Sequence, residues 1–176
     1  KFNRAKPDFA PLAAQVSKAG AQAVLMVASG SAVVDAGAAL RAAGSAAQIV
    51  TLSNNASGGF IKGLGTNARG VIVTQVYPHE RAVTYPMVKE AQELARAKGL
   101  AEITPAMLEG YAAAKVLVEG LKRAGPKPSR EKIQAALEGL RKFDLGGLEV
   151  SYSPEDHTGL DFADISIIGT DGKFRR

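Results

Sequence analysis

Cysteine and tryptophan are absent from this chain of 176 residues, and only two histidines occur. Without cysteine the chain has no disulfide framework, no thiolate metal site and no cysteine nucleophile. The absence of cysteine does not indicate the cellular compartment, because many exported proteins also lack cysteine. His79 and His157 have no metal-ligand partner at short spacing, so we assign no metal site. No nucleophile stands beside a recognisable base and acid, so we assign no catalytic residue and expect no enzyme.

Long hydrophobic runs are also missing, and Gly, Gln and Ser interrupt even the most apolar stretch, residues 19–34. The glycines lack the spacing of nucleotide-binding loops, so no cofactor is expected. The net charge of +5 is dispersed without interleaved aromatic residues, which argues against a nucleic-acid partner. With 46% hydrophobic residues, the chain can build a packed core.

The first eighty residues alternate helix and strand patterns. A helix is expected over 9–20, and short apolar runs at 23–28, 48–52 and 70–77 predict strands, the first buried on both faces. Ser31 is well placed to cap the helix between the first two strands. Strands and helices at this spacing predict an α/β fold, a parallel sheet with helices on both faces.

After Pro78 the pattern changes to long amphipathic helices over 86–99 and 105–125, followed by a third helix capped by Ser129. Strands are expected again at 148–153 and 162–168. On the second long helix we expect an inward stripe of Met107, Leu108, Tyr111, Val118 and Leu121.

Small polar side chains follow each of the first strands. Ser29 and Gly30 come after the first strand, Ser53 and Asn54 after the second, and Tyr77 ends the third. Because the carboxyl ends of parallel strands form the ligand-binding edge of open α/β sheets, these residues predict a small-molecule pocket.

Several segments together resemble the carboxyl-terminal half of a substrate-binding protein of the branched-chain amino-acid type, the receptor component of an ABC transporter. The resemblance covers nearly the whole chain, and the order and spacing of the motifs carry it. The motifs are Asp8–Leu12 with Gly20–Leu25, Ala39–Gly44, Glu109–Ala113, and Ser151–His157 with Asp171–Phe174.

This resemblance implies a type I periplasmic-binding fold with two lobes and a ligand in the cleft between them. Residues 1–78 would form an α/β segment of the second lobe, 79–142 would be helices that pack on the first lobe, and 143–176 would return to the second lobe. The fold would be incomplete, so the missing N-terminal half or self-association would cover apolar surface. The resemblance also implies a periplasmic location, with the signal peptide outside this chain, and a membrane permease as partner.

By the same resemblance the ligand contacts are Ser29, Gly30, Ser53, Asn54 and Tyr77. Relatives of the branched-chain type place an acidic residue in the second loop, where this chain has Ser53 with neutral neighbours. A carboxylate or an amide is therefore expected to fit at least as well as an amino acid, because a buried ammonium without a partner is costly. Two alternatives stay open: a ligand-sensing regulatory domain of the same fold, and a small α/β enzyme that uses the Ser29 or His157 region. A start at Lys1 without Met suits a processed or truncated product.

Overall fold

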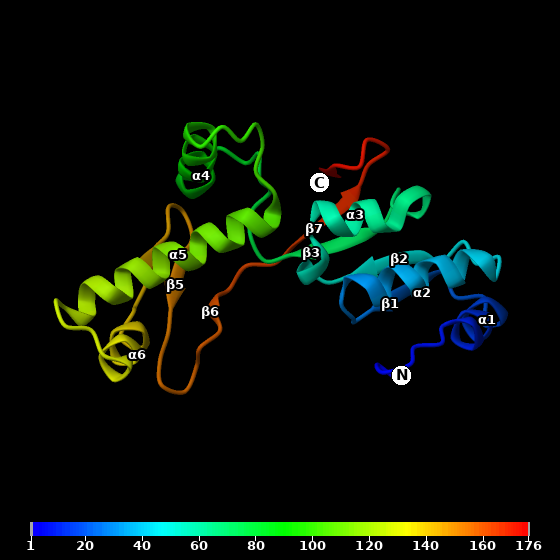
Figure 1. The fold of residues 1–176 in the computed structure, drawn as a ribbon, viewed down its shortest axis with the longest axis horizontal. Helices are drawn as coiled ribbons and strands as arrows, with labels where there is room; N and C mark the ends of the chain where they lie inside the picture. The colour runs from blue at the N-terminus through cyan, green and yellow to red at the C-terminus, as the bar shows by residue number, and fades with distance from the viewer. Residues whose placement is uncertain (1, 176) are drawn as a thin grey trace. The chain divides into compact units, whose positions relative to one another are not determined.

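The structure is a computed structural model, and it describes residues 2–175. The chain divides into two compact units (Figure 1). The first unit consists of residues 2–75 and 164–175, and the second unit of residues 76–163. The expected segments ended at Lys1 and Arg176, which lie outside the described residues.

The first unit contains a five-stranded sheet with the strand order β1-β2-β3-β7-β8. β1, β2 and β3 are parallel, whereas β7 is antiparallel to β3 and β8 is antiparallel to β7. The predicted α/β class and the parallel arrangement are confirmed. The strands are β1 (Ala23–Met26), β2 (Gln48–Thr51), β3 (Ile72–Gln75), β7 (Asp164–Ile168) and β8 (Phe174–Arg175).

Helices and short 3-10 turns connect these strands, because parallel neighbours need a crossover from the end of one strand to the start of the next. α1 precedes β1, α2 joins β1 to β2, and α3 lies between β2 and β3. The helices are α1 (Ala10–Lys18), α2 (Gly30–Ala42) and α3 (Gly58–Leu64), with 3-10 turns η1 (Ser53–Asn55) and η2 (Gly65–Asn67).

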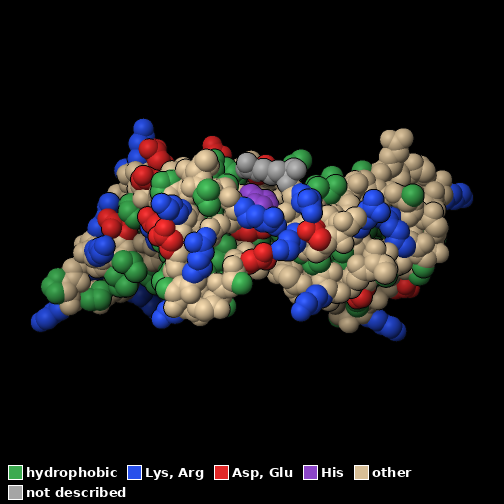
Figure 2. Space-filling view, turned by 90° about the horizontal axis from the view of Figure 1, so that it is seen from above, with side chains coloured by type: hydrophobic (Ala, Val, Ile, Leu, Met, Phe, Trp, Pro, Cys, Tyr) green, Lys and Arg blue, Asp and Glu red, His purple; other side chains and the backbone are tan. Residues whose placement is uncertain are grey.

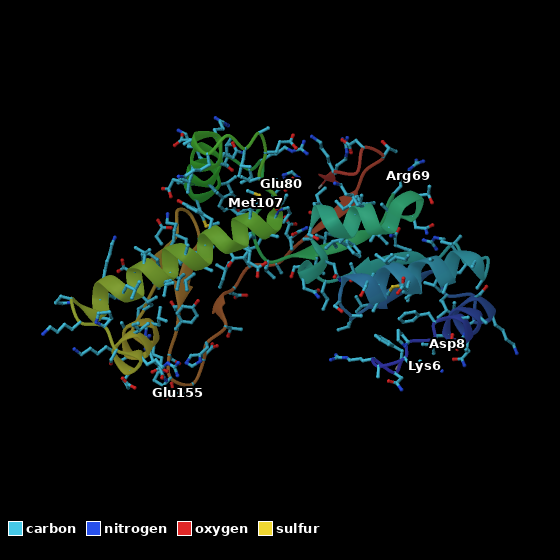
Figure 3. All side chains as sticks on the ribbon, in the orientation of Figure 1. Lys6, Asp8, Arg69, Glu80, Met107 and Glu155 are labelled. Carbon is cyan, nitrogen blue, oxygen red and sulfur yellow. The ribbon has the colours of Figure 1, made fainter. Side chains whose placement is uncertain are left out.

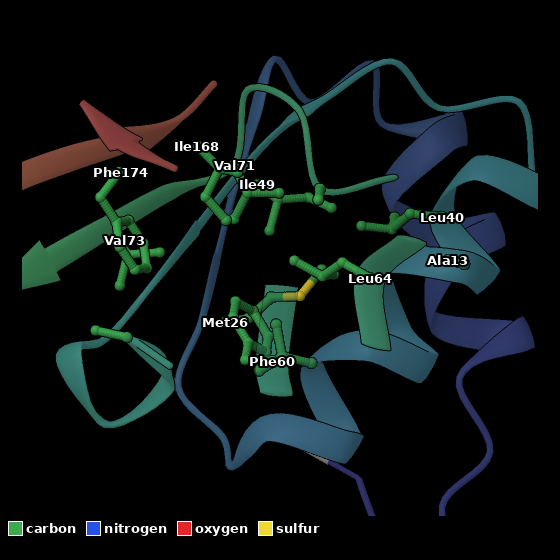
Figure 4. Packing of buried hydrophobic residues seen from close by; sticks show 13 residues of the cluster. Ala13, Met26, Leu40, Ile49, Phe60, Leu64, Val71, Val73, Ile168 and Phe174 are labelled. Carbon is green, nitrogen blue, oxygen red and sulfur yellow. The ribbon is translucent and has the colours of Figure 1, made fainter. Parts of the chain in front are cut away.

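One face of this sheet is buried under the helices (Figure 4). The strand register aligns Met26, Thr51, Val73 and Ser166 in one row, and all four are buried. Side chains from all three helices join the same cluster as the buried strand residues. The helical members include Ala13, Val33, Leu40, Phe60 and Leu64.

The opposite face of the sheet is only partly covered within the first unit. Its row consists of the register partners Leu25, Val50, Ile72 and Ile167. Leu25 is 62% exposed and Val27 is 67% exposed, so the prediction that the first strand is buried on both faces is wrong. Side chains of α1, α2 and α3 all join one core cluster.

The second unit is built from three helices and a three-stranded antiparallel sheet with the order β4-β5-β6. The Thr104 hydroxyl accepts a hydrogen bond from the Met107 amide at 3.2 Å, and Ser129 caps the last helix, as predicted. The elements are α4 (Pro86–Ala97), α5 (Pro105–Ala124), α6 (Arg130–Glu138), β4 (Phe143–Asp144), β5 (Glu149–Ser151) and β6 (Gly159–Leu160).

The core of the second unit buries only part of the stripe predicted for α5. Leu108 is fully buried, and Tyr111 is half-buried. Met107, Val118 and Leu121 are exposed, so their predicted inward orientation is wrong within this unit. The reason is that the face of α5 with Leu108 and Ala112 packs against α4 and the small sheet, which leaves a neighbouring apolar face uncovered. No helix in the described part of the chain is long and apolar enough to span a bilayer.

The second unit also includes the residues that follow α6. Residues 143–163 pack with α4, α5 and α6 in the second unit, and only residues 164–175 return to the large sheet. β4, β5 and β6 pair with one another, so this stretch forms its own small sheet.

Candidate functional site

A cavity of about 500 Å³ lies in the first unit at the carboxyl ends of β1 and β2. Ser29 and Asn54, both predicted from the sequence, line this cavity together. Their approach follows from the parallel pairing of β1 with β2, which brings the two strand ends to one edge. The lining consists of Phe2, Arg4, Pro7, Val27, Ala28, Ser29, Ser31, Ala32, Asp35, Leu52 and Asn54.

Amide side chains from the second loop hold the end of the first strand in place. Asn55 Nδ2 donates to the Ala28 carbonyl at 3.1 Å and to Thr51 Oγ1 at 2.8 Å. Thr51 Oγ1 in turn donates to the Met26 carbonyl at 3.0 Å, and Asn54 Nδ2 reaches the Ala28 carbonyl at 3.4 Å. Asn55 is 1% exposed, so this network holds the main chain at Ala28, which lines the cavity, from a buried position.

Ser29 is the N-cap residue of α2, but its side chain makes no capping hydrogen bond. Its hydroxyl therefore does not cap the helix, and it lines the cavity. Ser31 lies inside the first turn, so the prediction that Ser31 caps this helix is wrong. Gly30 is the first helical residue, and a Cβ there would lie 3.7 Å from Asn55 Oδ1. The helix begins at the cavity, where its free amides favour negative charge.

The other two predicted residues lie elsewhere. Ser53 does not line the cavity, and its amide donates to Thr74 Oγ1 at 3.1 Å. Tyr77 belongs to the second unit, where it packs against that unit's core, and burial raises the pKa of its hydroxyl. The first unit thus contains four of the five predicted residues.

Two charged residues of the cavity were missed by sequence reasoning. Arg4 reaches it from the segment before α1, and Asp35 from the second turn of α2. Nothing local marks Arg4, because it stands in an irregular stretch far in sequence from the loops. Asp35 did carry a signal: it is the one charged residue in the apolar first half of its helix, four residues after Ser31 and hence on the same helix face.

The two histidines both belong to the second unit, so Ser29 has no histidine within its own unit. His157 Nε2 lies 3.2 Å from Glu138 Oε1 on an exposed surface. No group of three or more His, Asp or Glu among the described residues is arranged to hold a metal ion. Basic side chains are spread over the visible surface with acidic ones among them (Figure 2).

The sequence matches the family described as periplasmic binding protein over residues 1–164, so the chain belongs to this family. Among curated proteins, no sequence matches the chain.

Solved structures share the fold. An extracellular ligand-binding receptor from Verminephrobacter eiseniae is 30% identical, with a TM-score of 0.78 over 96% of this chain and 48% of that one. A possible leucine/isoleucine/valine-binding protein from Rhodopirellula baltica is 27% identical, with a TM-score of 0.77 over 88% and 42%. A leucine binding protein from Thermotoga maritima is 21% identical, with a TM-score of 0.83 over 99% and 49%. The chain spans about half the length of these structures.

Proposed function

We propose that this chain is part of an extracytoplasmic solute-binding receptor that delivers a small molecule to the membrane permease of an ABC transporter. The observation that carries the proposal is the cavity at the carboxyl ends of β1 and β2, where Ser29 and Asn54 meet. Family membership supports it, and so does the similarity to the possible leucine/isoleucine/valine-binding protein from Rhodopirellula baltica. The proposed location is the periplasm, and the proposed role is binding and release without catalysis.

The proposed ligand is a small amino acid or a related carboxylate or amide. The Arg4 guanidinium and the first amides of α2 suit a carboxylate group. The loop at Ser53 is neutral, but Asp35 supplies a negative charge in the same cavity. With both charges available, an α-amino acid finds a partner for its ammonium as well as for its carboxylate.

Isothermal titration calorimetry with leucine and isocaproate tests this proposal, because isocaproate is leucine without the ammonium group. We expect leucine to bind more tightly, and Asp35→Asn to weaken leucine by about tenfold or more while leaving isocaproate nearly unchanged. The matched control is Asp161→Asn, an exposed aspartate outside the cavity. Equal binding of both compounds would assign a carboxylate ligand, and binding of neither would overturn the proposal for this cavity. Genes for a permease and an ATPase beside this one would favour transport over sensing.

We also propose that a second polypeptide segment, equivalent to the half of the related structures that this chain does not span, covers two apolar faces. One is the outer row of the sheet with Leu25 and Ile167, and the other is the face of α5 with Val118 and Leu121. Leaving them in water costs about 25 cal/mol per Å² of apolar surface. In this proposal the first unit belongs to the second lobe of the receptor, and α5 packs on the first lobe.

Native mass spectrometry and sedimentation of the chain test this part. We expect a complex with a second segment or with further copies, and we expect Leu25→Ser to weaken the association while changing the stability of the chain by less than about 0.5 kcal/mol. Ile49 lies on the covered face of the same sheet, so Ile49→Ala should instead lower the free energy of unfolding by about 2–5 kcal/mol. A stable monomer at all concentrations would contradict the proposed cover.

A further inference from the structure

The second unit contains a separate cavity of about 170 Å³ that the proposed ligand site does not use. It lies between the segment before α4, the carboxyl-terminal half of α4 and the loop that follows this helix, and all of its lining belongs to the second unit. Figure 3 labels Glu80, which comes from the segment before α4. The polar part of the lining consists of Glu80, Arg81, Gln92, Arg96 and Glu102.

Glu80 is the unusual member of this set. It is only 8% exposed, and its Oε2 is buried without a hydrogen-bond partner among the described residues. His79 Nδ1 lies 3.6 Å from this oxygen, beyond hydrogen-bond distance, and the same nitrogen accepts a hydrogen bond from the Arg81 amide at 3.1 Å. A buried carboxylate without a hydrogen-bond donor is unfavourable, so a ligand that donates a hydrogen bond to Glu80 would relieve this cost.

The neighbouring polar groups are engaged with other acceptors. Gln92 Nε2 donates to the Glu80 main-chain carbonyl at 2.8 Å, and Arg96 NH2 donates to Gln92 Oε1 at 3.1 Å. Neither contact satisfies the Glu80 carboxylate. In the described part of the chain, no lysine or arginine forms an ion pair with Glu80, although Arg81 and Arg96 both line the cavity.

We propose that this cavity binds a small zwitterionic amino acid, whose ammonium group donates to the Glu80 carboxylate and whose carboxylate is held by Arg81 and Arg96. At about 170 Å³ the cavity is smaller than the usual drug-like site, which suits a ligand of a few heavy atoms. Ala95 and Ile103 supply an apolar wall for a short side chain. The site is independent of the cavity at Ser29 and Asn54, because the two lie in different units.

The test is an amide-detected NMR titration of the 176-residue chain with L-alanine, L-lactate and L-alaninol. Lactate replaces the ammonium with a hydroxyl group, and alaninol replaces the carboxylate with an alcohol. We expect alanine to shift the amides of residues 79–81, 92–96 and 100–103, and both analogues to bind at least about tenfold more weakly. Glu80→Gln should weaken the binding of alanine by a similar factor, whereas Glu93→Gln, at an exposed glutamate of α4 that does not line the cavity, should not.

The outcomes separate this site from the proposed receptor site. Shifts confined to residues 28–35 and 52–55 would place alanine at the receptor site and overturn the second site. Equal binding of alanine and lactate, or unchanged binding by a folded Glu80→Gln variant, would also overturn it. The spectrum of each variant shows whether the second unit is folded, and a matched Arg96→Gln variant tests the carboxylate side if Glu80→Gln does not fold.

Discussion

Lys115 Nζ lies 2.6 Å from Glu90 Oε2, and the Tyr111 hydroxyl donates to the same carboxylate oxygen at 2.9 Å. Lys115 also donates to the Leu145 main-chain carbonyl at 2.7 Å. One lysine therefore joins α4, α5 and the turn between β4 and β5. These contacts set the position of α5 within the second unit, and they determine how two of its groups titrate.

Acid should weaken the contacts of Lys115 and Tyr111 with the Glu90 carboxylate. The hydrogen bond from Lys115 is the largest cause that lowers the pKa of Glu90 below its ordinary value. A carboxyl group with a lowered folded-state pKa stabilises the protein above its unfolded-state pKa, and the contribution is lost as pH falls through the folded-state pKa. At neutral pH we expect Glu90→Gln to lower the free energy of unfolding by at most about 1 kcal/mol, because the side chain is half-exposed. In strong acid we expect the substitution to leave the free energy of unfolding unchanged.

Urea denaturation of the wild type and of Glu90→Gln, at neutral and at acid pH, measures this difference. Glu93→Gln, on the same helix, serves as the control and should show no such dependence on pH. A difference between wild type and Glu90→Gln that stays constant down to strong acid would contradict the assignment.

At alkaline pH the relevant group is Tyr111. Burial, and next its hydrogen bond to the Glu90 carboxylate, raise the pKa of Tyr111 to about 12. The neutral phenol is therefore favoured in the folded state, and its contribution is present below the unfolded-state pKa of about 10 and is lost as pH rises toward 12. The ultraviolet titration of wild type minus that of Tyr111→Phe should show one tyrosine with a midpoint near 12. In Glu90→Gln that midpoint should fall, and an unchanged midpoint would show that the carboxylate has no part in the shift.

Gly146 occupies a position that a larger residue cannot take without strain. Its φ is +113°, and an added Cβ would lie 2.6 Å from the Met87 main-chain nitrogen. That nitrogen also donates to the Gly146 carbonyl at 3.0 Å. We expect Gly146→Ala to lower the free energy of unfolding by about 1–3 kcal/mol or more. Gly110→Ala, in the middle of α5 with open space around it, should instead raise it by about 0.5–1 kcal/mol, and thermal unfolding compares the two. Similar effects of both substitutions would refute this account.

Adjacent asparagines in the second loop should separate stability from binding. Asn55→Ala removes the buried donor to the Ala28 carbonyl and to Thr51 Oγ1, which should cost about 1–3 kcal/mol. Asn54→Ala removes an exposed and long hydrogen bond, so its stability should stay within about 0.5 kcal/mol of the wild type while affinity for the cavity ligand falls. Chemical denaturation and calorimetry on both variants test this pair. A large loss of stability in Asn54→Ala would overturn the distinction.

Local signals in the sequence predict much of the fold. Residues close together in the sequence predict the helix caps at Thr104 and Ser129 and the helices that begin at Pro86 and Pro105. They also predict the order of the first three strands. The sequence also indicates that Ser29 and Asn54 lie near each other, because neighbouring parallel strands have their carboxyl ends at the same edge of the sheet.

Only the tertiary structure decides which apolar surfaces are covered and which charges come together. An unalternating run such as residues 23–28 does not show that Leu25 faces away from the helices, because that depends on register and on where α1, α2 and α3 pack. Arg4 and Asp35 join Asn54 across long stretches of sequence, and packing buries Glu80 Oε2 without a hydrogen-bond partner among the described residues. The amino-acid sequence by itself determines the elements and their order through short-range physics. The ligand sites depend on contacts between residues distant in sequence, which form only when the elements pack.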